Sequence, residues 1–96
     1  MPKSARQGDS VATGHASVTK TVLAAPSQES VFVNGILACR LGDKTVSHNF
    51  LGTPHVADIS GSSNSVYIAG AKAARLGDAC DAGSITSGSS NVYIGD

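Results

Sequence analysis

The sequence predicts an all-β fold made of three imperfect repeats related by a pseudo-three-fold axis. A phrase ending in Arg-x-Gly-Asp occurs three times, roughly every 35 residues, as KSARQGD at 3–9, LACRLGD at 37–43 and KAARLGD at 72–78. A second phrase, a short β-branched and aromatic run with a glycine after it, also occurs three times, as SVFVNG at 30–35, SVYIAG at 65–70 and NVYIGD at 91–96. Such runs are typical of short strands, and helix signals are nearly absent.

Each of the three aromatic runs predicts a strand with two different faces. Alternation places Val or Ile on one face and a single aromatic residue on the other, namely Phe32, Tyr67 and Tyr93. These aromatic residues either fill a core or flank a sheet, or they form a three-fold set suited to a trimeric partner. The sequence leaves both interpretations open. The segment SVTKTV at 17–22 also alternates like a strand.

The Arg-x-Gly-Asp phrases predict tight turns. Their glycines suit a backbone with positive φ, and their aspartates can accept hydrogen bonds from nearby N–H groups. The three arginines of the chain, Arg6, Arg40 and Arg75, each stand three residues before the aspartate of their copy. We therefore expect a structural role in turn formation and local ion pairing.

Composition restricts the class of protein. The 96 residues predict one domain, 1–96, with no effector extension. The chain has no tryptophan and only four Phe and Tyr residues, so we expect a thin core. A formal net charge of zero argues against nucleic acid as a partner. No apolar run reaches the roughly 20 residues that span a bilayer, and the N-terminus MPKSARQGDS lacks the apolar region of a signal peptide.

A residue able to bind a transition metal follows each Gly-Asp. If the repeats surround a three-fold axis, the loops that carry these residues meet there. Three imidazoles and one thiolate would form a closed tetrahedral site for one structural Zn²⁺, which would offset the thin core. The predicted ligands are His15, His48, His55 and Cys80.

The other cysteine, Cys39, aligns with Ala5 and Ala74 in the repeat, so we expect it to pack in the core. A rival interpretation is a redox or disulfide-stabilised binding module that joins Cys39 to Cys80. Since the sequence begins without a signal peptide, reduced thiols are the default.

The chain resembles the PAAR-repeat proteins over essentially its whole length. The resemblance rests on the three Arg-x-Gly-Asp elements, the VFVNG and VYIAG strands and the closing SGSSNVYIGD. The sequence departs from that family in two places. The tetrapeptides read KSAR, LACR and KAAR, without the family's proline, and SHNFLGTPH replaces the usual central Cys…His-Gly pattern.

The resemblance implies a small pointed cone with zinc near its apex. Its base would cap a trimeric β-helical spike, such as VgrG of type VI secretion or a phage tail needle, with one copy per trimer. The implied role is non-enzymatic: the tip sharpens the spike, and contact with the target membrane is transient. The protein would be made in the cytoplasm and delivered outside by the machine.

A small zinc hydrolase is the main alternative. Catalytic zinc keeps an open position for water beside a general base. The only glutamate, Glu29, is far from every histidine in the sequence, and there is no His-Glu-x-x-His motif. Asp58 or Asp81 could still act as the base.

Overall fold

The computed structural model describes residues 1–16 and 18–95, and over these residues it contains strands and turns but no helix. The all-β prediction is confirmed. Ser17, the first residue of the strand expected at 17–22, lies outside the described residues, as does Asp96. In the described part no helix has the length and apolar character needed to cross a bilayer. The strands are β1 (Ser10–Ala12), β2 (Lys20–Val22), β3 (Phe32–Val33), β4 (Ile36–Leu37), β5 (His48–Phe50), β6 (Thr53–His55), β7 (Tyr67–Ile68), β8 (Ala71–Lys72), β9 (Ala79–Cys80) and β10 (Gly83–Ile85).

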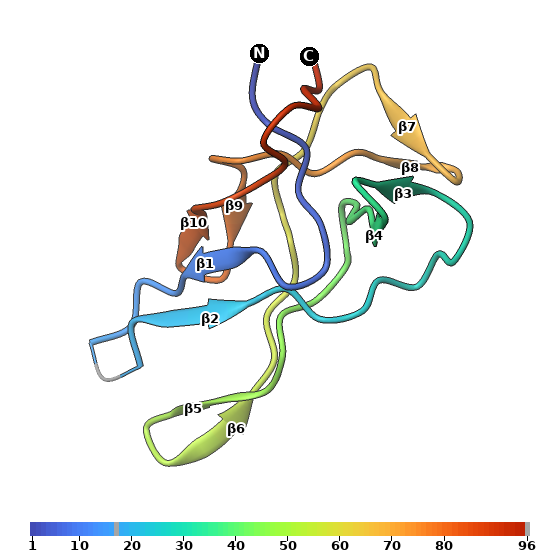
Figure 1. Ribbon diagram of the computed structural model, residues 1–96. Helices are drawn as coiled ribbons and strands as arrows, with labels where there is room; N and C mark the ends of the chain where they lie inside the picture. The colour runs from blue at the N-terminus through green and yellow to red at the C-terminus, as the bar shows by residue number, and fades with distance from the viewer. Residues whose placement is uncertain (17, 96) are drawn as a thin grey trace.

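The strands form one four-stranded antiparallel sheet and three hairpins (Figure 1). The sheet has the order β2-β1-β10-β9, so the N-terminal and C-terminal thirds of the chain are paired, with Val11 opposite Ile85. The hairpins are β3–β4, β5–β6 and β7–β8. The sheet therefore joins the first and last repeats directly.

A closed ring of backbone hydrogen bonds relates the three repeats. Ala5 donates to Ala74 over 3.0 Å, Ala74 donates to Cys39 over 3.1 Å, and Cys39 donates to Ala5 over 3.0 Å. A second cyclic set of bonds runs around the axis in the opposite sense, from Gln7 to Leu37, from Leu41 to Lys72 and from Leu76 to Lys3. Each repeat thus donates to one neighbour in the first set and to the other neighbour in the second, and the predicted pseudo-three-fold axis passes through this ring.

The three aromatic runs occupy equivalent places around the axis. Phe32 pairs with Leu37 in the β3–β4 hairpin, and Tyr67 pairs with Lys72 in the β7–β8 hairpin. In the third place Tyr93 bridges to Lys3, so this pair is formed by segments near the two ends of the chain, which lie side by side (Figure 1). The third unit is therefore assembled from both ends of the sequence.

The Arg-x-Gly-Asp turns have the predicted conformation. In each copy the aspartate carboxylate accepts a 2.7 Å hydrogen bond from the backbone N–H of the arginine three residues earlier. The glycines have φ between 87° and 93°, a region that side chains with a Cβ rarely adopt. Each guanidinium also lies 2.9 to 3.6 Å from its own aspartate. The phrase is therefore a structural device that turns the chain three times.

The core has two parts, and both follow the three-fold pattern. One surrounds the backbone ring and includes Leu23, Ile59 and Ile85, all almost fully buried, together with Cys39. The packing role expected for Cys39 is confirmed. The other lies under the hairpins and is formed by the aliphatic face of the aromatic runs, as expected from their alternation; its valines and isoleucines are Val31, Val33, Val66, Ile68, Val92 and Ile94.

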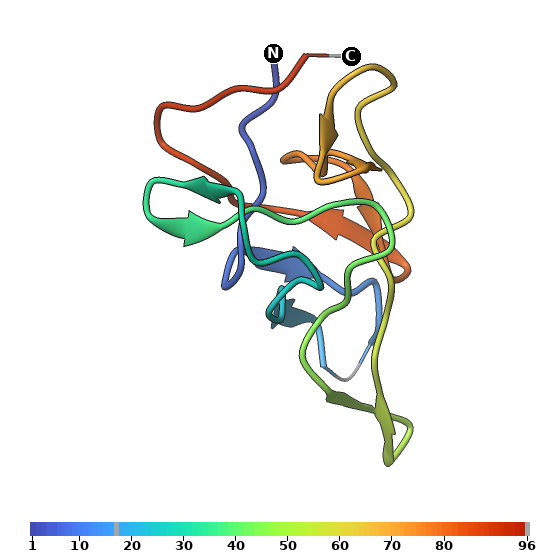
Figure 2. The ribbon, with the colours of Figure 1, turned by 90° about the vertical axis from the view of Figure 1, so that its right-hand side faces the viewer.

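The molecule is elongated, with principal extents of 36, 24 and 21 Å. Figure 2 shows that the β5–β6 hairpin projects to form the narrow end, whereas β3–β4, β7–β8 and both termini lie toward the other end. We call residues 45–57, which contain this hairpin, the tip segment, and the rest of the described chain the body. In each repeat a strand pair follows the Arg-x-Gly-Asp turn, namely β1–β2, β5–β6 and β9–β10, and of these three pairs only β5–β6 stands outside the four-stranded sheet.

Candidate metal centre

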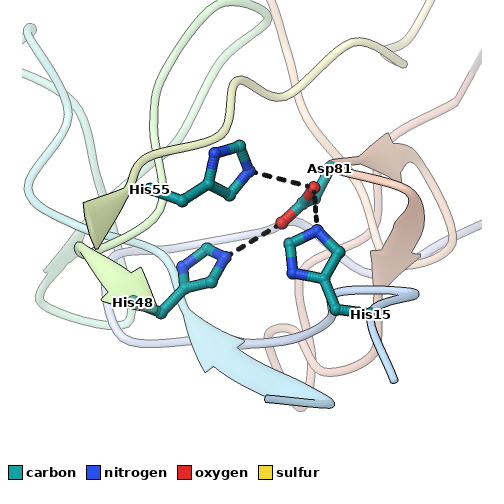
Figure 3. Close-up of side chains that lie close together, drawn as sticks. All are labelled: His15, His48, His55 and Asp81. Atoms are coloured by element: carbon teal, nitrogen blue, oxygen red, sulfur yellow. Dashed lines mark hydrogen bonds and ion pairs between the residues drawn. The ribbon is translucent and has the colours of Figure 1, made fainter. Parts of the chain in front are cut away.

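Four side chains from three separate segments meet where the tip segment joins the body (Figure 3). His15 lies in the loop after β1, His48 and His55 lie on the paired strands of the hairpin, and Asp81 lies in the turn between β9 and β10. One ligand atom from each of the four lies within 4.8 Å of the others. This group could hold a metal ion.

The three imidazoles point their Nε2 atoms at a single carboxylate. His15 and His55 approach one oxygen of Asp81, Oδ1, at 2.9 and 3.3 Å, and His48 approaches Oδ2 at 3.0 Å. The imidazole ring centroids are 5.0 to 5.5 Å apart. The donors therefore surround a common centre, and none of them is directed toward solvent as an isolated group would be.

The hairpin register places its two histidines on one face. His48 and His55 are directly opposite each other in the antiparallel pair, so their side chains project to the same side. The Nδ1 of His48 lies 3.1 Å from the backbone oxygen of Val46. Because a carbonyl only accepts, this contact suits the tautomer with its proton on Nδ1, in which the Nε2 lone pair can bind a metal in place of the hydrogen bond to Asp81. One backbone contact thus orients this ring as metal ligands are commonly oriented.

A close contact between two body loops brings His15 to Asp81. Gly14 has φ of 78°, and a Cβ at this position would lie 2.4 Å from the backbone oxygen of Ala82. Ala82 in turn donates a 3.0 Å hydrogen bond to the carbonyl of Thr13. A glycine is needed for this approach, which sets the loop before His15 directly against the turn that carries Asp81.

The cluster is largely shielded from water, and its carboxylate is held in the charged form. The side chains of His15, His48 and Asp81 are 6%, 6% and 7% exposed, and that of His55 is 34% exposed. Burial raises the pKa of Asp81, but hydrogen bonds from His55, His15 and His48 outweigh it, and the pKa falls below its ordinary value. Asp81 is therefore ionised at neutral pH and available as an anionic ligand.

Phe50 forms part of this shield. Its ring centroid lies 4.3 Å from that of His15 and 5.7 Å from that of His55. Phe50 is two residues after His48 on β5, so the alternation of the strand places both side chains on the same face. An apolar ring over the imidazoles limits the access of water and of competing ligands.

The donor set fits a first-row transition ion. Imidazole nitrogens combined with one carboxylate oxygen are ligands that Zn²⁺ accepts, and four protein donors make a closed site. The Nδ1 of His15 is buried and has no hydrogen-bond partner among the described residues.

The structure places Asp81 where the sequence analysis expected Cys80. Cys80 is fully buried in the core around the backbone ring and does not belong to the group. Burial, followed by the charges of Asp81 and Asp58, raises the pKa of this thiol to about 11. In this structure the fourth member of the cluster is therefore Asp81, and Cys80, the predicted fourth ligand, lies outside it.

Two further expectations can be placed in the structure. Asp58, considered as a general base, forms an exposed ion pair with Lys44 and is not part of the cluster. Cys39 and Cys80 are both free and buried, so the described structure holds no bridge between them.

The aromatic residues expected at a partner surface are far from the metal centre in the fold. Phe32 on β3, Tyr67 on β7 and Tyr93 near the C-terminus are 57%, 59% and 49% exposed. Their equivalent pairings set them around the three-fold axis on the part of the body away from the tip segment (Figures 1 and 2). They do not fill the core.

Comparison with known proteins agrees with the fold and the repeats. The family model for the PAAR motif matches residues 13–85, a span that includes all four residues of the candidate metal centre. A search of curated proteins finds no match. PAAR-motif proteins are structural components of spike tips, in type VI secretion and related phage machinery. With three repeats around one axis and a matching motif over most of its length, the chain belongs to the PAAR-motif family.

Proposed function

We propose that this protein is a non-enzymatic spike tip that caps the blunt end of a trimeric β-helical spike, VgrG-like or a phage tail needle. The observation that carries the proposal is the pseudo-three-fold body of a PAAR-motif chain, which ends in three equivalent exposed aromatic residues. A single chain with this symmetry can match a three-fold platform, so one copy binds each trimer.

The docking surface in this proposal is formed by Phe32, Tyr67 and Tyr93. Aromatic side chains bury roughly 150–250 Å² each and dominate the energetics of many interfaces. Half-exposed aromatics at equivalent positions would each meet one subunit of the trimer. Docking would also cover the short strand edges at this end of the body, which otherwise remain open to non-specific pairing.

Zinc is the ion that we propose for the metal centre, in a structural role. Residues His15, His48, His55 and Asp81 would hold it, and the ion would supply four strong bonds that join the tip segment to two loops of the body. The low exposure of three of the four donors supports a closed site without a substrate position. A rigid narrow end suits a protein that helps a spike to pierce a target envelope.

The proposed location follows from this role. The chain is made in the cytoplasm, rides at the extreme end of the spike, and is carried outside when the secretion system or phage tail contracts. The target membrane is touched only during that passage.

Binding to a purified trimeric spike tests the proposal. Light scattering after size-exclusion chromatography should show one chain per trimer, and the double variant Phe32→Asp/Tyr67→Asp should lose the complex because two of three contacts acquire a buried charge. Val56→Asp is the matched control, since Val56 is also exposed but lies in the tip segment. No complex with any β-helical trimer, or equal loss in the control, would contradict the docking surface.

A further inference from the structure

The outermost turn of the tip segment carries an apolar residue with no structural reason to be there. Leu51 and Gly52 form the two-residue turn between β5 and β6, with φ of 52° and 79°. The Leu51 side chain is 82% exposed, so it packs against little of the protein. Left-handed backbone is uncommon for leucine, and the exposed side chain gains nothing from burial that would offset this cost.

Two of the other two-residue hairpin turns provide a comparison within the same chain. Asn34-Gly35 joins β3 to β4 and Ala69-Gly70 joins β7 to β8, and all four of these residues also have positive φ. Asparagine before glycine is the preferred pair for such turns. Leucine at the corresponding position is neither required by the backbone nor favoured by water. A local outlier of this kind points toward a function.

The surroundings of Leu51 are also apolar and uncharged. Phe50, Val46 and Val56 are 39%, 39% and 45% exposed on the same short segment. Residues 45–57 contain no Asp, Glu, Lys or Arg. The nearest charges along the chain, Lys44 and Asp58, pair with each other at the point where the tip segment leaves the body. The narrow end of the molecule is therefore a neutral, projecting, partly apolar point (Figure 2).

We infer that this point enters a lipid surface, with Leu51 as the leading side chain. A projecting turn offers no concave surface that would hold a peptide or a small molecule, whereas a bilayer receives a wedge. Strands of three residues reach about 10 Å at ~3.3 Å per residue, which matches the ~5–10 Å depth of interfacial insertion. Because the segment is uncharged, the inferred contact needs no anionic lipid.

A second protein strand is the less suitable occupant. Phe50 and Thr53 flank the two-residue turn and pair with each other, so the alternation of the ladder turns the backbone of the next pair, Asn49 and Pro54, outward. Proline has no N–H, and the outer edge of β6 therefore lacks a donor for an added strand. This edge is blunted against strand addition and against pairing with a second copy.

This inference uses the proposed function for the direction in which the tip meets a membrane, but it can be tested separately. The chain contains no tryptophan, so Leu51→Trp introduces a single fluorescent reporter at the turn. With the metal-loaded full chain and vesicles of pure phosphatidylcholine, the emission should move to shorter wavelength and be quenched by lipids brominated near the headgroup end of the acyl chains. Adding phosphatidylserine should leave the shift unchanged.

Two matched variants sharpen the experiment. Tyr67→Trp places the same reporter at the opposite end of the body and should show no shift. Leu51→Asn restores the pair found at Asn34-Gly35; it should keep its fold, its metal and its binding to a trimeric spike, but lose co-flotation with vesicles. No shift at position 51 in folded protein, an equal shift at position 67, or a shift caused by self-association without vesicles would each overturn the inference. Loss of spike binding alone would contradict only the proposed function.

Discussion

The body and the tip segment are held by different kinds of interaction. In the body, every repeat contributes the same stabilising features: one Arg-x-Gly-Asp turn, one part of the backbone ring and one part of the aliphatic cluster under the hairpins. The tip segment contains the one of the three hairpins after these turns that stands outside the four-stranded sheet, and the two strands of this hairpin pair with each other. Beyond its base, where the Val46 N–H donates a 3.0 Å hydrogen bond to the carbonyl of Val22, its links to the body are the contacts of His48 and His55 with Asp81 and of Phe50 with His15. The body is therefore stabilised by repetition, and the tip segment by one cluster.

The largest expected effect comes from breaking a device of the body. Asp9 is 6% exposed and accepts hydrogen bonds from the Arg6 backbone, the Arg6 guanidinium and Ser87. Asp9→Ala leaves these buried donors unpaired and should lower the free energy of unfolding by about 3 kcal/mol. Urea unfolding followed by circular dichroism measures this change.

Asp58→Ala is the control for that variant. It removes an aspartate whose partner is Lys44, but both side chains are about 60% exposed, so the expected loss is below about 1 kcal/mol. If the two variants lost equal stability, the repeated turn would have no special role.

Removing the metal should break the tip segment and spare the body. Chelation leaves His48 and His55 without their central ion, and we expect backbone amides in 48–55 to exchange with solvent at least about tenfold faster. The ring amides of Ala5, Cys39 and Ala74 should keep their protection. Hydrogen exchange followed by NMR, with and without added zinc, distinguishes this outcome from unfolding of the whole chain, which would contradict the separation of the two regions.

A pair of neighbouring residues tests which side chain completes the centre. Asp81→Ala should weaken metal binding by more than roughly 100-fold, the upper limit of what losing a merely supporting residue costs. Cys80→Ala should leave metal affinity unchanged and cost about 1 kcal/mol of stability, because it removes a small buried side chain. Competition with a chromogenic chelator gives the affinities, and the opposite pattern would restore Cys80 as the ligand.

The last expected effect appears only at alkaline pH and concerns the pH dependence of the body. Burial, followed by the charges of Asp43 and Asp9, raises the pKa of the Cys39 thiol from 9.0 to about 12. The folded state therefore keeps a proton that the unfolded chain loses above pH 9, and stability should fall between pH 9 and pH 12 by up to about 1.4 kcal/mol per pH unit from this group. Cys39→Ala copies the alanines of the other repeats and should reduce this slope, measured by urea unfolding at several alkaline pH values. An unchanged slope would mean that the thiol does not contribute.

Repetition explains how much of the body could be predicted from the sequence. The three copies of Arg-x-Gly-Asp predicted the turns and the axis. They also predicted the burial of Cys39, because it stands at the position equivalent to Ala5 and Ala74. The four-stranded sheet was less accessible, because β1 and β10 are separated by most of the chain and their short runs carry no pairing signal.

The candidate metal centre depended on a difference of one residue. Cys80 and Asp81 are neighbours, and at the end of a strand successive side chains face opposite ways. A shift of the strand by one residue would therefore exchange which of the two side chains faces the core. The sequence did not determine this position, and the prediction chose the cysteine because thiolate is a common zinc ligand. Cys80 packs in the same buried cluster as Ile85 and Val11, and Asp81, in left-handed backbone at the turn, lies beside the histidines. The turn conformation of Leu51 likewise had no signal in the sequence pattern.

X-ray absorption spectroscopy of the purified, metal-loaded protein tests the central claim most directly, namely that one metal joins the tip segment to the body through three imidazoles and Asp81. The account predicts one zinc per chain, with imidazole and oxygen scatterers at about 2.0–2.1 Å and no sulfur in the first shell. A sulfur scatterer at about 2.3 Å, or folded protein that takes up no metal, would contradict it.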